Sequence, residues 1–95
     1  MAQFGSVFKM KPKAGKKDEL LKMAMRDDGR DVDGFVMGHM VDAGDEIWGI
    51  AVFRDEASYR KNADDPKQHE EFLKMRDLLE TDPEWHDGTV ETMGQ

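Results

Sequence analysis

The sequence predicts a single α+β domain of the ferredoxin-like class, with the order strand, helix, strand, strand, helix, strand along one antiparallel sheet. Two observations lead to this prediction. Segments of strand length and segments with apolar residues at helical spacing follow one another in that order, without a linker or a repeat between them. A chain of 95 residues is also long enough for one core and too short for two, so residues 1–95 are expected to form one domain.

The first strand is predicted at residues 4–10 and the first helix at residues 16–28. Aromatic and branched residues stand close together in the strand, which is typical of a strand partly buried on both faces. A turn at Ala14 and Gly15 separates the two elements. The helix carries an apolar stripe at helical spacing, formed by Leu20, Leu21, Ala24 and Met25.

An antiparallel hairpin is predicted next, from a strand at residues 32–41, a loop at 42–45 and a strand at 47–53. Almost every residue of 47–53 is apolar, as expected for a central strand covered on both faces. Side chains alternate between the two faces of a strand. Along residues 32–41, one face would therefore hold Phe35, Met37, His39 and Val41, and the other Val36 and Met40.

The second helix is predicted to start twice. Asp55 stands where a helix N-cap belongs, with Ser58 three residues later. A second cap follows at Asp65, with Pro66 at the first helical position and Gln68 at the third, which is the pattern of a capping box. The helix is therefore expected to be broken or kinked just before Asp65.

After this restart the helix is predicted to continue over residues 67–80. Its inner face would carry Phe72, Met75 and Leu79. Residues 83–88 are interpreted as a turn that contains Trp85, as a packing residue, and His86. The last strand is then predicted at residues 89–93, where apolar and polar residues alternate.

In this arrangement both helices cover one face of the sheet and leave the other face uncovered. The strands nevertheless contain apolar residues on both sides. A second copy of the chain is therefore expected to lie against the open face, which predicts a homodimer.

The composition excludes several classes of function. A net charge of −7 opposes binding to a polyanion, so no nucleic-acid partner is expected, and the one basic cluster is interpreted as a solvated surface (Lys9, Lys11, Lys13, Lys16 and Lys17). The absence of cysteine excludes disulfides and thiolate metal sites and fits a reducing compartment. No apolar run approaches the roughly 18 residues that a membrane span needs. The chain is expected to be cytoplasmic, without a membrane partner.

Several local phrases resemble the small dimeric α+β-barrel proteins of the antibiotic-biosynthesis-monooxygenase type. The resemblance extends over almost the whole chain in element order and size. The phrases that carry it are Gly34-Phe35, Val52-Phe53-Arg54-Asp55, Asp65-Pro66 and Pro83-Glu84-Trp85-His86-Asp87-Gly88. The resemblance implies a dimer whose two sheets face each other, with a pocket between sheet and helices in each subunit.

That family includes cofactor-free oxygenases of quinol-like aromatics, haem-degrading enzymes and proteins without an established activity. The haem-degrading branch uses an asparagine on the first strand and a tryptophan and a histidine on the second helix. The resemblance places Phe8, Asn62 and Phe72 at those positions in this chain. All three differ, so haem degradation is not expected.

Candidate site residues are those that strands and helices could turn toward the pocket, and His39 would point either to the pocket or to the dimer core. His39 and Asn62 are the candidate catalytic residues, because an imidazole base or an amide could deprotonate or polarise a phenol. The predicted pocket lining is Phe8, Met37, His69 and Phe72. The three histidines do not have the spacing of a metal motif, so neither a metal nor a cofactor is predicted.

Two functions remain open at this point. The first is a cofactor-independent monooxygenase acting on a small aromatic, quinol-like substrate. The second is a non-catalytic protein of the same fold that binds a small ligand or serves in assembly. A cavity that contains both His39 and Asn62 would favour the first, and side chains packed solidly there would favour the second.

Overall fold

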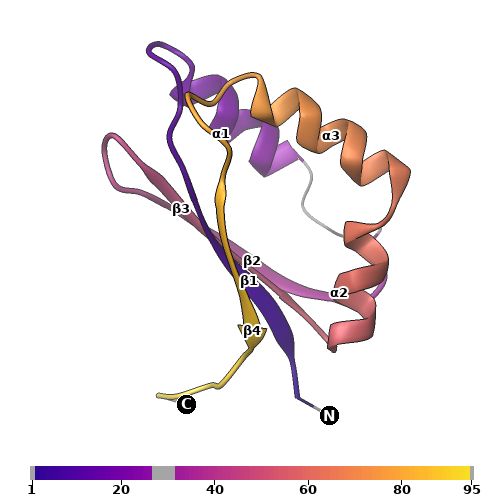
Figure 1. Ribbon diagram of the computed structural model, residues 1–95. Helices are drawn as coiled ribbons and strands as arrows, with labels where there is room; N and C mark the ends of the chain where they lie inside the picture. Colours follow the sequence, from indigo (N-terminus) through magenta and orange to yellow (C-terminus); the bar gives the residue numbers. More distant parts are fainter. Residues whose placement is uncertain (1, 27–31, 95) are drawn as a thin grey trace.

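A computed structural model describes residues 2–26 and 32–94 and confirms the α+β, ferredoxin-like class. Four strands form one antiparallel sheet in the order β2-β3-β1-β4. All three helices lie on one side of this sheet (Figure 1). Along the chain the elements are β1 (Phe4–Met10), α1 (Lys17–Arg26), β2 (Phe35–Asp42), β3 (Ile47–Phe53), α2 (Glu56–Ala63), α3 (Pro66–Arg76) and β4 (Glu84–Thr89).

The helices fill the space over the sheet unevenly. Beside α1, at one end of the sheet, five apolar side chains are buried against one another: Met10, Leu20, Ile47, Leu78 and Leu79. We call this cluster the packed end. The predicted end of the first helix, at residues 27–28, lies outside the described residues. None of the helices in the described parts of the chain is long and apolar enough to cross a membrane.

The double start of the second helix is confirmed. The Asp55 carboxylate accepts a hydrogen bond from the backbone N–H of Ser58 at 2.8 Å, which holds the pKa of Asp55 below its usual value. The Asp65 carboxylate accepts from the N–H of Lys67 at 2.8 Å. Two short helices, α2 and α3, therefore replace one long helix.

The predicted capping box at the second start is not formed. In a capping box the residue at the third helical position, here Gln68, would bind the backbone N–H of the cap. That N–H, of Asp65, instead donates to the carbonyl of Asn62 at 3.1 Å. The Gln68 side chain lies at the cavity described below.

Two of the phrases that carry the family resemblance meet in space. The N–H of Arg54 donates to the carbonyl of Gly34 at 2.7 Å, where β3 leaves the sheet beside the start of β2. Gly34 has φ of +81°, and a Cβ at this position would collide with the buried side chain of Ser58. Glycine is required here for both reasons.

The predicted position of the last strand is wrong. Residues 84–89 form β4 and pair with β1 in the register Lys9 to Glu84 through Phe4 to Thr89, so Trp85 and His86 lie on a strand and not in a turn. The helix before it also ends earlier than predicted, at Arg76. Backbone hydrogen bonds join residues 78 and 80 to the segment after β1 in its place. The N–H of Lys13 donates to the carbonyl of Leu78, and the N–H of Glu80 donates to the carbonyl of Lys11. Pairing with a long neighbouring strand thus overrides the turn propensity of Asp87 and Gly88.

Candidate functional site

A cavity of about 540 Å³ lies between the sheet and the helices, beside the packed end. Its floor comes from the four strands, and α2 and α3 contribute most of the remaining wall. This volume is in the range of sites for small organic ligands. The lining residues are Ser6, Phe8, Met23, Val32, Phe35, Ala51, Phe53, Tyr59, Asn62, Ala63, Gln68, His69, Glu71, Phe72, Met75 and Trp85.

Cross-strand neighbours divide the cavity floor into three rows that run across the four strands. The Trp85 row consists of Met40, Gly49, Phe8 and Trp85. The small-residue row consists of Gly38, Ala51, Ser6 and Asp87. The Phe53 row consists of Phe35, Phe53, Phe4 and Thr89. Neighbouring rows on one face are roughly 7 Å apart, because they are separated by two residues along each strand.

One wall of the cavity is built on the Trp85 row. The rings of Phe8 and Trp85 lie 5.0 Å apart, and Phe72 of α3 extends the wall at 6.2 Å from Trp85. His69 stacks on Phe72 with ring centroids 6.4 Å apart. Gly49 makes this wall possible, since a Cβ there would collide with the Phe8 ring.

The opposite wall is built on the Phe53 row. Phe35 and Phe53 meet edge to face at 5.5 Å, and Tyr59 of α2 meets Phe53 in the same way at 5.6 Å. Phe4 lies 5.2 Å from Tyr59 on the other side. Such edge-to-face pairs hold rings in defined positions. The low floor between the two aromatic walls is the small-residue row.

The polar groups at the cavity come mainly from the helices. On α2, Tyr59 and Asn62 are three residues apart and therefore share a face. The Tyr59 hydroxyl donates to the Asp87 carboxylate at 2.9 Å. Partial burial, followed by this hydrogen bond, raises the pKa of Tyr59, and the nearby Ser6 hydroxyl acts in the opposite direction. On α3, Gln68, His69 and Glu71 reach the cavity.

The structure brings four of the six sequence-derived candidates together. Phe8, Asn62, His69 and Phe72 all line the cavity. Two others, Met37 and His39, do not line it. They pair with Val52 and Ile50 of β3 and lie on the opposite, uncovered face of the sheet, so the expectation of one cavity with His39 and Asn62 is corrected.

A β-bulge explains the corrected placement. The register of β2 against β3 shifts between Phe35 and Met37, so Val36 is an extra residue that opposes no partner. Strict alternation predicted Phe35 on the face of Met37 and His39. Because of the extra residue, Phe35 lies on the cavity side and Met37 on the open side.

Three residues that the proposals below use, or that form a wall of the site, are absent from the sequence-derived candidates: Ser6, Tyr59 and Trp85. Ser6 lies two residues from Phe8 on β1, so alternation alone would have placed both on one face. Tyr59 precedes Asn62 by three residues on α2, so helical spacing would have placed both on one face. Trp85 was assigned to a turn, and only its pairing with Phe8 turns its ring toward the cavity.

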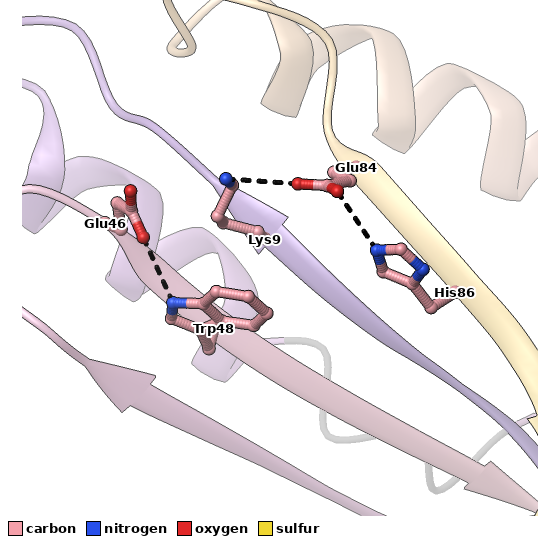
Figure 2. Close-up of polar contacts among 5 residues, drawn as sticks. All are labelled: Lys9, Glu46, Trp48, Glu84 and His86. Atoms are coloured by element: carbon pink, nitrogen blue, oxygen red, sulfur yellow. Dashed lines mark hydrogen bonds and ion pairs between the residues drawn. The ribbon is translucent and has the colours of Figure 1, made fainter.

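The open face of the sheet carries a polar network (Figure 2). The Lys9 ammonium lies 3.1 Å from the Glu84 carboxylate, which also contacts His86 at 3.1 Å. The hydrogen bond and charge of Glu84 raise the pKa of Lys9, and Lys9 in turn holds the pKa of Glu84 below its usual value. The Trp48 indole donates to Glu46 at 3.2 Å. His86 on β4 thus contacts Glu84, two residues away on the same strand.

The basic cluster at the end of β1 lies among carboxylates. Four of its five lysines, Lys9, Lys11, Lys16 and Lys17, are within 4 Å of an acidic side chain: Glu84, Glu80, Glu19 and Asp42. Exposed pairs of this kind contribute little stability. Among residues 2–26 and 32–94, no three histidine or acidic side chains are arranged to hold a metal ion.

Comparisons with known proteins identify the fold. No protein-family model matches the chain, and no curated protein matches it in sequence. The structure is similar to SnoaB, a cofactor-independent oxygenase from Streptomyces nogalater, in an asparagine-to-alanine variant (17% identity, TM-score 0.83, 98% of this chain and 97% of that one). It is also similar to a monooxygenase from the gene ActVA-Orf6 of Streptomyces coelicolor in complex with nanaomycin D (20%, 0.83, 99% and 92%).

A third solved structure carries the family name. It is a protein from Chloroflexus aurantiacus J-10-fl, provisionally named an antibiotic biosynthesis monooxygenase (20% identity, TM-score 0.76, 98% of each chain). Other structures with this fold include a dimeric ferredoxin-like protein of unknown function. The resemblance expected from the sequence is therefore confirmed for the fold, which is the level that identities of this size support.

Proposed function

We propose that this chain is a cofactor-independent monooxygenase that acts on a small, planar, quinol-like aromatic compound. The observation that carries the proposal is a cavity with two aromatic walls and a few polar groups, Asn62 and His69 among them. That make-up suits a flat aromatic ligand whose oxygens need hydrogen bonds. The similarity of the fold to a cofactor-independent oxygenase and to a ligand-bound monooxygenase supports it.

The reaction needs no cofactor if the substrate itself supplies the electrons. In this scheme His69 accepts the phenolic proton and the Asn62 amide stabilises the resulting phenolate, whose electron density reaches a ring carbon. That carbon, which carries a hydrogen atom, reduces oxygen and forms a carbon–oxygen bond, and the peroxide takes the proton back from His69 to give a hydroperoxide. Loss of water from the hydroperoxide leaves a carbonyl, so one oxygen atom enters the product and the other leaves as water.

The proposal is tested by oxygen uptake with a panel of quinols and no added cofactor. Replacing Asn62 with alanine should lower turnover roughly 100-fold or more, the size of effect that a lost acid, base or polarising group produces. His39→Ala is the matched control, because the sheet separates His39 from the cavity, and its turnover should equal that of the wild type. An equal loss of turnover in both variants would show that the cavity is not the site of the reaction.

The alternative is a protein that binds the aromatic ligand without changing it. One observation favours it: in the described part of the chain, no hydrogen bond from another side chain orients His69 or Asn62. A catalytic base is usually oriented by a third group. Binding of quinols without any oxygen uptake by the wild type would establish this alternative.

We also propose that the protein is a homodimer in which a second copy covers the open face. Val7, Met37 and Val41 are exposed on that face, and Val41 is 58% exposed. A dimeric ferredoxin-like protein is among the structures that share this fold. Light scattering should therefore give about twice the chain mass of 10.9 kDa. A stable monomer at micromolar concentration would contradict the dimer.

A further inference from the structure

Ser6 combines burial with an unused hydroxyl. It lies on β1, one of the two inner strands, and only 3% of its surface is exposed. Among the described residues, no group forms a hydrogen bond of good geometry with its Oγ, although the Tyr59 hydroxyl is close enough for Ser6 to lower its pKa. A buried hydroxyl without a partner is destabilising, because its bonds to water are not replaced. The chain therefore carries a polar atom at a cost, beside the apolar floor residues Phe8, Ala51 and Phe53.

Ser6 lines the cavity, and its neighbours on the sheet are small. Its cross-strand neighbour on β3 is Ala51, and beyond it stands Gly38 on β2, so this part of the floor is low. Aromatic rings rise on either side, Phe8 on one and Phe53 on the other. The edge of a planar molecule that enters between these rings would come down on Ser6.

The hydroxyl of Tyr59 determines which kind of ligand group would bind beside Ser6. Asp87, the other cross-strand neighbour of Ser6, accepts the proton of Tyr59 at 2.9 Å. The Tyr59 oxygen can then only accept a further hydrogen bond, whereas the Ser6 hydroxyl can donate and accept. A ligand hydroxyl satisfies both, since it donates to one oxygen and accepts from the other. An ether or a halogen cannot donate.

We propose that Ser6 and Tyr59 form a polar subsite that binds a hydroxyl group on the edge of the aromatic ligand, with Asp87 holding Tyr59 in place. The proposal rests on the proposed function for its ligand class and names the feature that selects within that class. Ser6 is a specificity-determining residue here, separate from Asn62 and His69. The Ser6 hydroxyl forms a hydrogen bond of good geometry only when the ligand is bound.

The test compares two probes of nearly equal shape, 1-naphthol and 1-fluoronaphthalene, by calorimetry with the protein in the syringe. The wild type should prefer 1-naphthol. In Ser6→Ala the affinity for 1-naphthol should fall about 5- to 10-fold, the size of one net hydrogen bond, while that for 1-fluoronaphthalene changes less than about 2-fold. Equal affinities of wild type and Ser6→Ala for 1-naphthol would overturn the subsite alone. Failure of the wild type to bind either probe would overturn the proposed function with it.

A stability measurement separates a ligand anchor from a structural serine. If the Ser6 hydroxyl is unsatisfied without ligand, Ser6→Ala should keep or raise the urea midpoint. Ser58 is the matched control, because it is also buried but accepts a hydrogen bond from Arg54 at 3.0 Å. Ser58→Ala should lower the midpoint and leave the preference for 1-naphthol unchanged. A lower midpoint in Ser6→Ala, with both probes weakened equally, would make Ser6 a structural residue.

Discussion

The space between the sheet and the helices is filled at one end and hollow at the other. At the packed end, Leu20 of α1 is completely buried against Ile47 and Met10. At the hollow end, α2 and α3 lie over a cavity whose walls are aromatic rings. Aliphatic side chains from facing elements interdigitate and leave no space, whereas rings that contact one another along two cross-strand rows keep the helices away from the floor. The kind of side chain, and not the layer, decides where a cavity forms.

The largest expected effect tests the packed end. Leu20→Ala should lower the free energy of unfolding by roughly 2–5 kcal/mol, because it leaves a void in a fully packed cluster. Leu73→Ala is the same chemical change on α3, at a residue that is 42% exposed, and should cost no more than about 0.5 kcal/mol. Urea denaturation measures both. Similar costs would mean that the two ends are equally packed.

A smaller effect is expected from the cap of the helix over the hollow end. Asp65→Ala removes the hydrogen bond to the N–H of Lys67 and should cost about 1 kcal/mol of stability. The neighbouring Asp64→Ala keeps that bond, and its change should stay within about 0.5 kcal/mol. An unchanged denaturation midpoint for Asp65→Ala would show that α3 starts elsewhere.

Filling the hollow end should change stability least while removing function. Ala51→Leu places a large side chain on the low floor of the cavity. Adding atoms to a packed core costs about 1–3 kcal/mol, but here the side chain enters empty space, so we expect a change within about 1 kcal/mol. Binding of 1-naphthol should be lost. A loss of stability as large as that of Leu20→Ala would contradict the comparison.

The titration of Tyr59 sharpens the same comparison through a spectroscopic signal. Tyr59 is the only tyrosine of the chain, so the phenolate absorbance band reports on it alone. Its pKa is raised, which means that the folded state favours the protonated phenol. Its contribution to stability is therefore present below the unfolded pKa and is lost as the pH rises through the folded pKa. Asp87→Asn should reduce the rise without abolishing it, because burial is the larger cause. Ionisation at or below the ordinary pKa would contradict burial at the cavity wall.

Much of the fold follows from local sequence signals. The strand at residues 47–53, the caps at Asp55 and Asp65 and the hairpin loop all depend on nearest neighbours in the chain, and the structure contains each of them. The position of β4 depends on its partner strand, so Asp87 and Gly88 were misleading as turn residues. The half-filled layer could not be predicted, because it depends on how rings from six elements contact one another.

The candidate site was partly predictable for the same reason. Periodicity predicts four of the lining residues. It places Phe8 on the strand face that points toward the helices, and it places Asn62, His69 and Phe72 on the helix faces that point toward the sheet. Met37 and His39 were misplaced by a single extra residue in β2, and a bulge leaves no clear signal in a sequence of alternating apolar residues. Tyr59 and Ser6 are brought together by Asp87, which is distant in sequence: it accepts a hydrogen bond from Tyr59 and is the cross-strand neighbour of Ser6.

The helix α3 has one property that sets it apart from α1: none of its residues is buried. Its inner face rests on the cavity, so its attachment depends on the caps and on a few rings such as Phe72. Backbone amides in a segment with little buried contact exchange with solvent through local opening. A ligand that fills the cavity would supply the missing contact. Deuterium uptake in α3 should then report cavity occupancy, while uptake at the packed end stays constant.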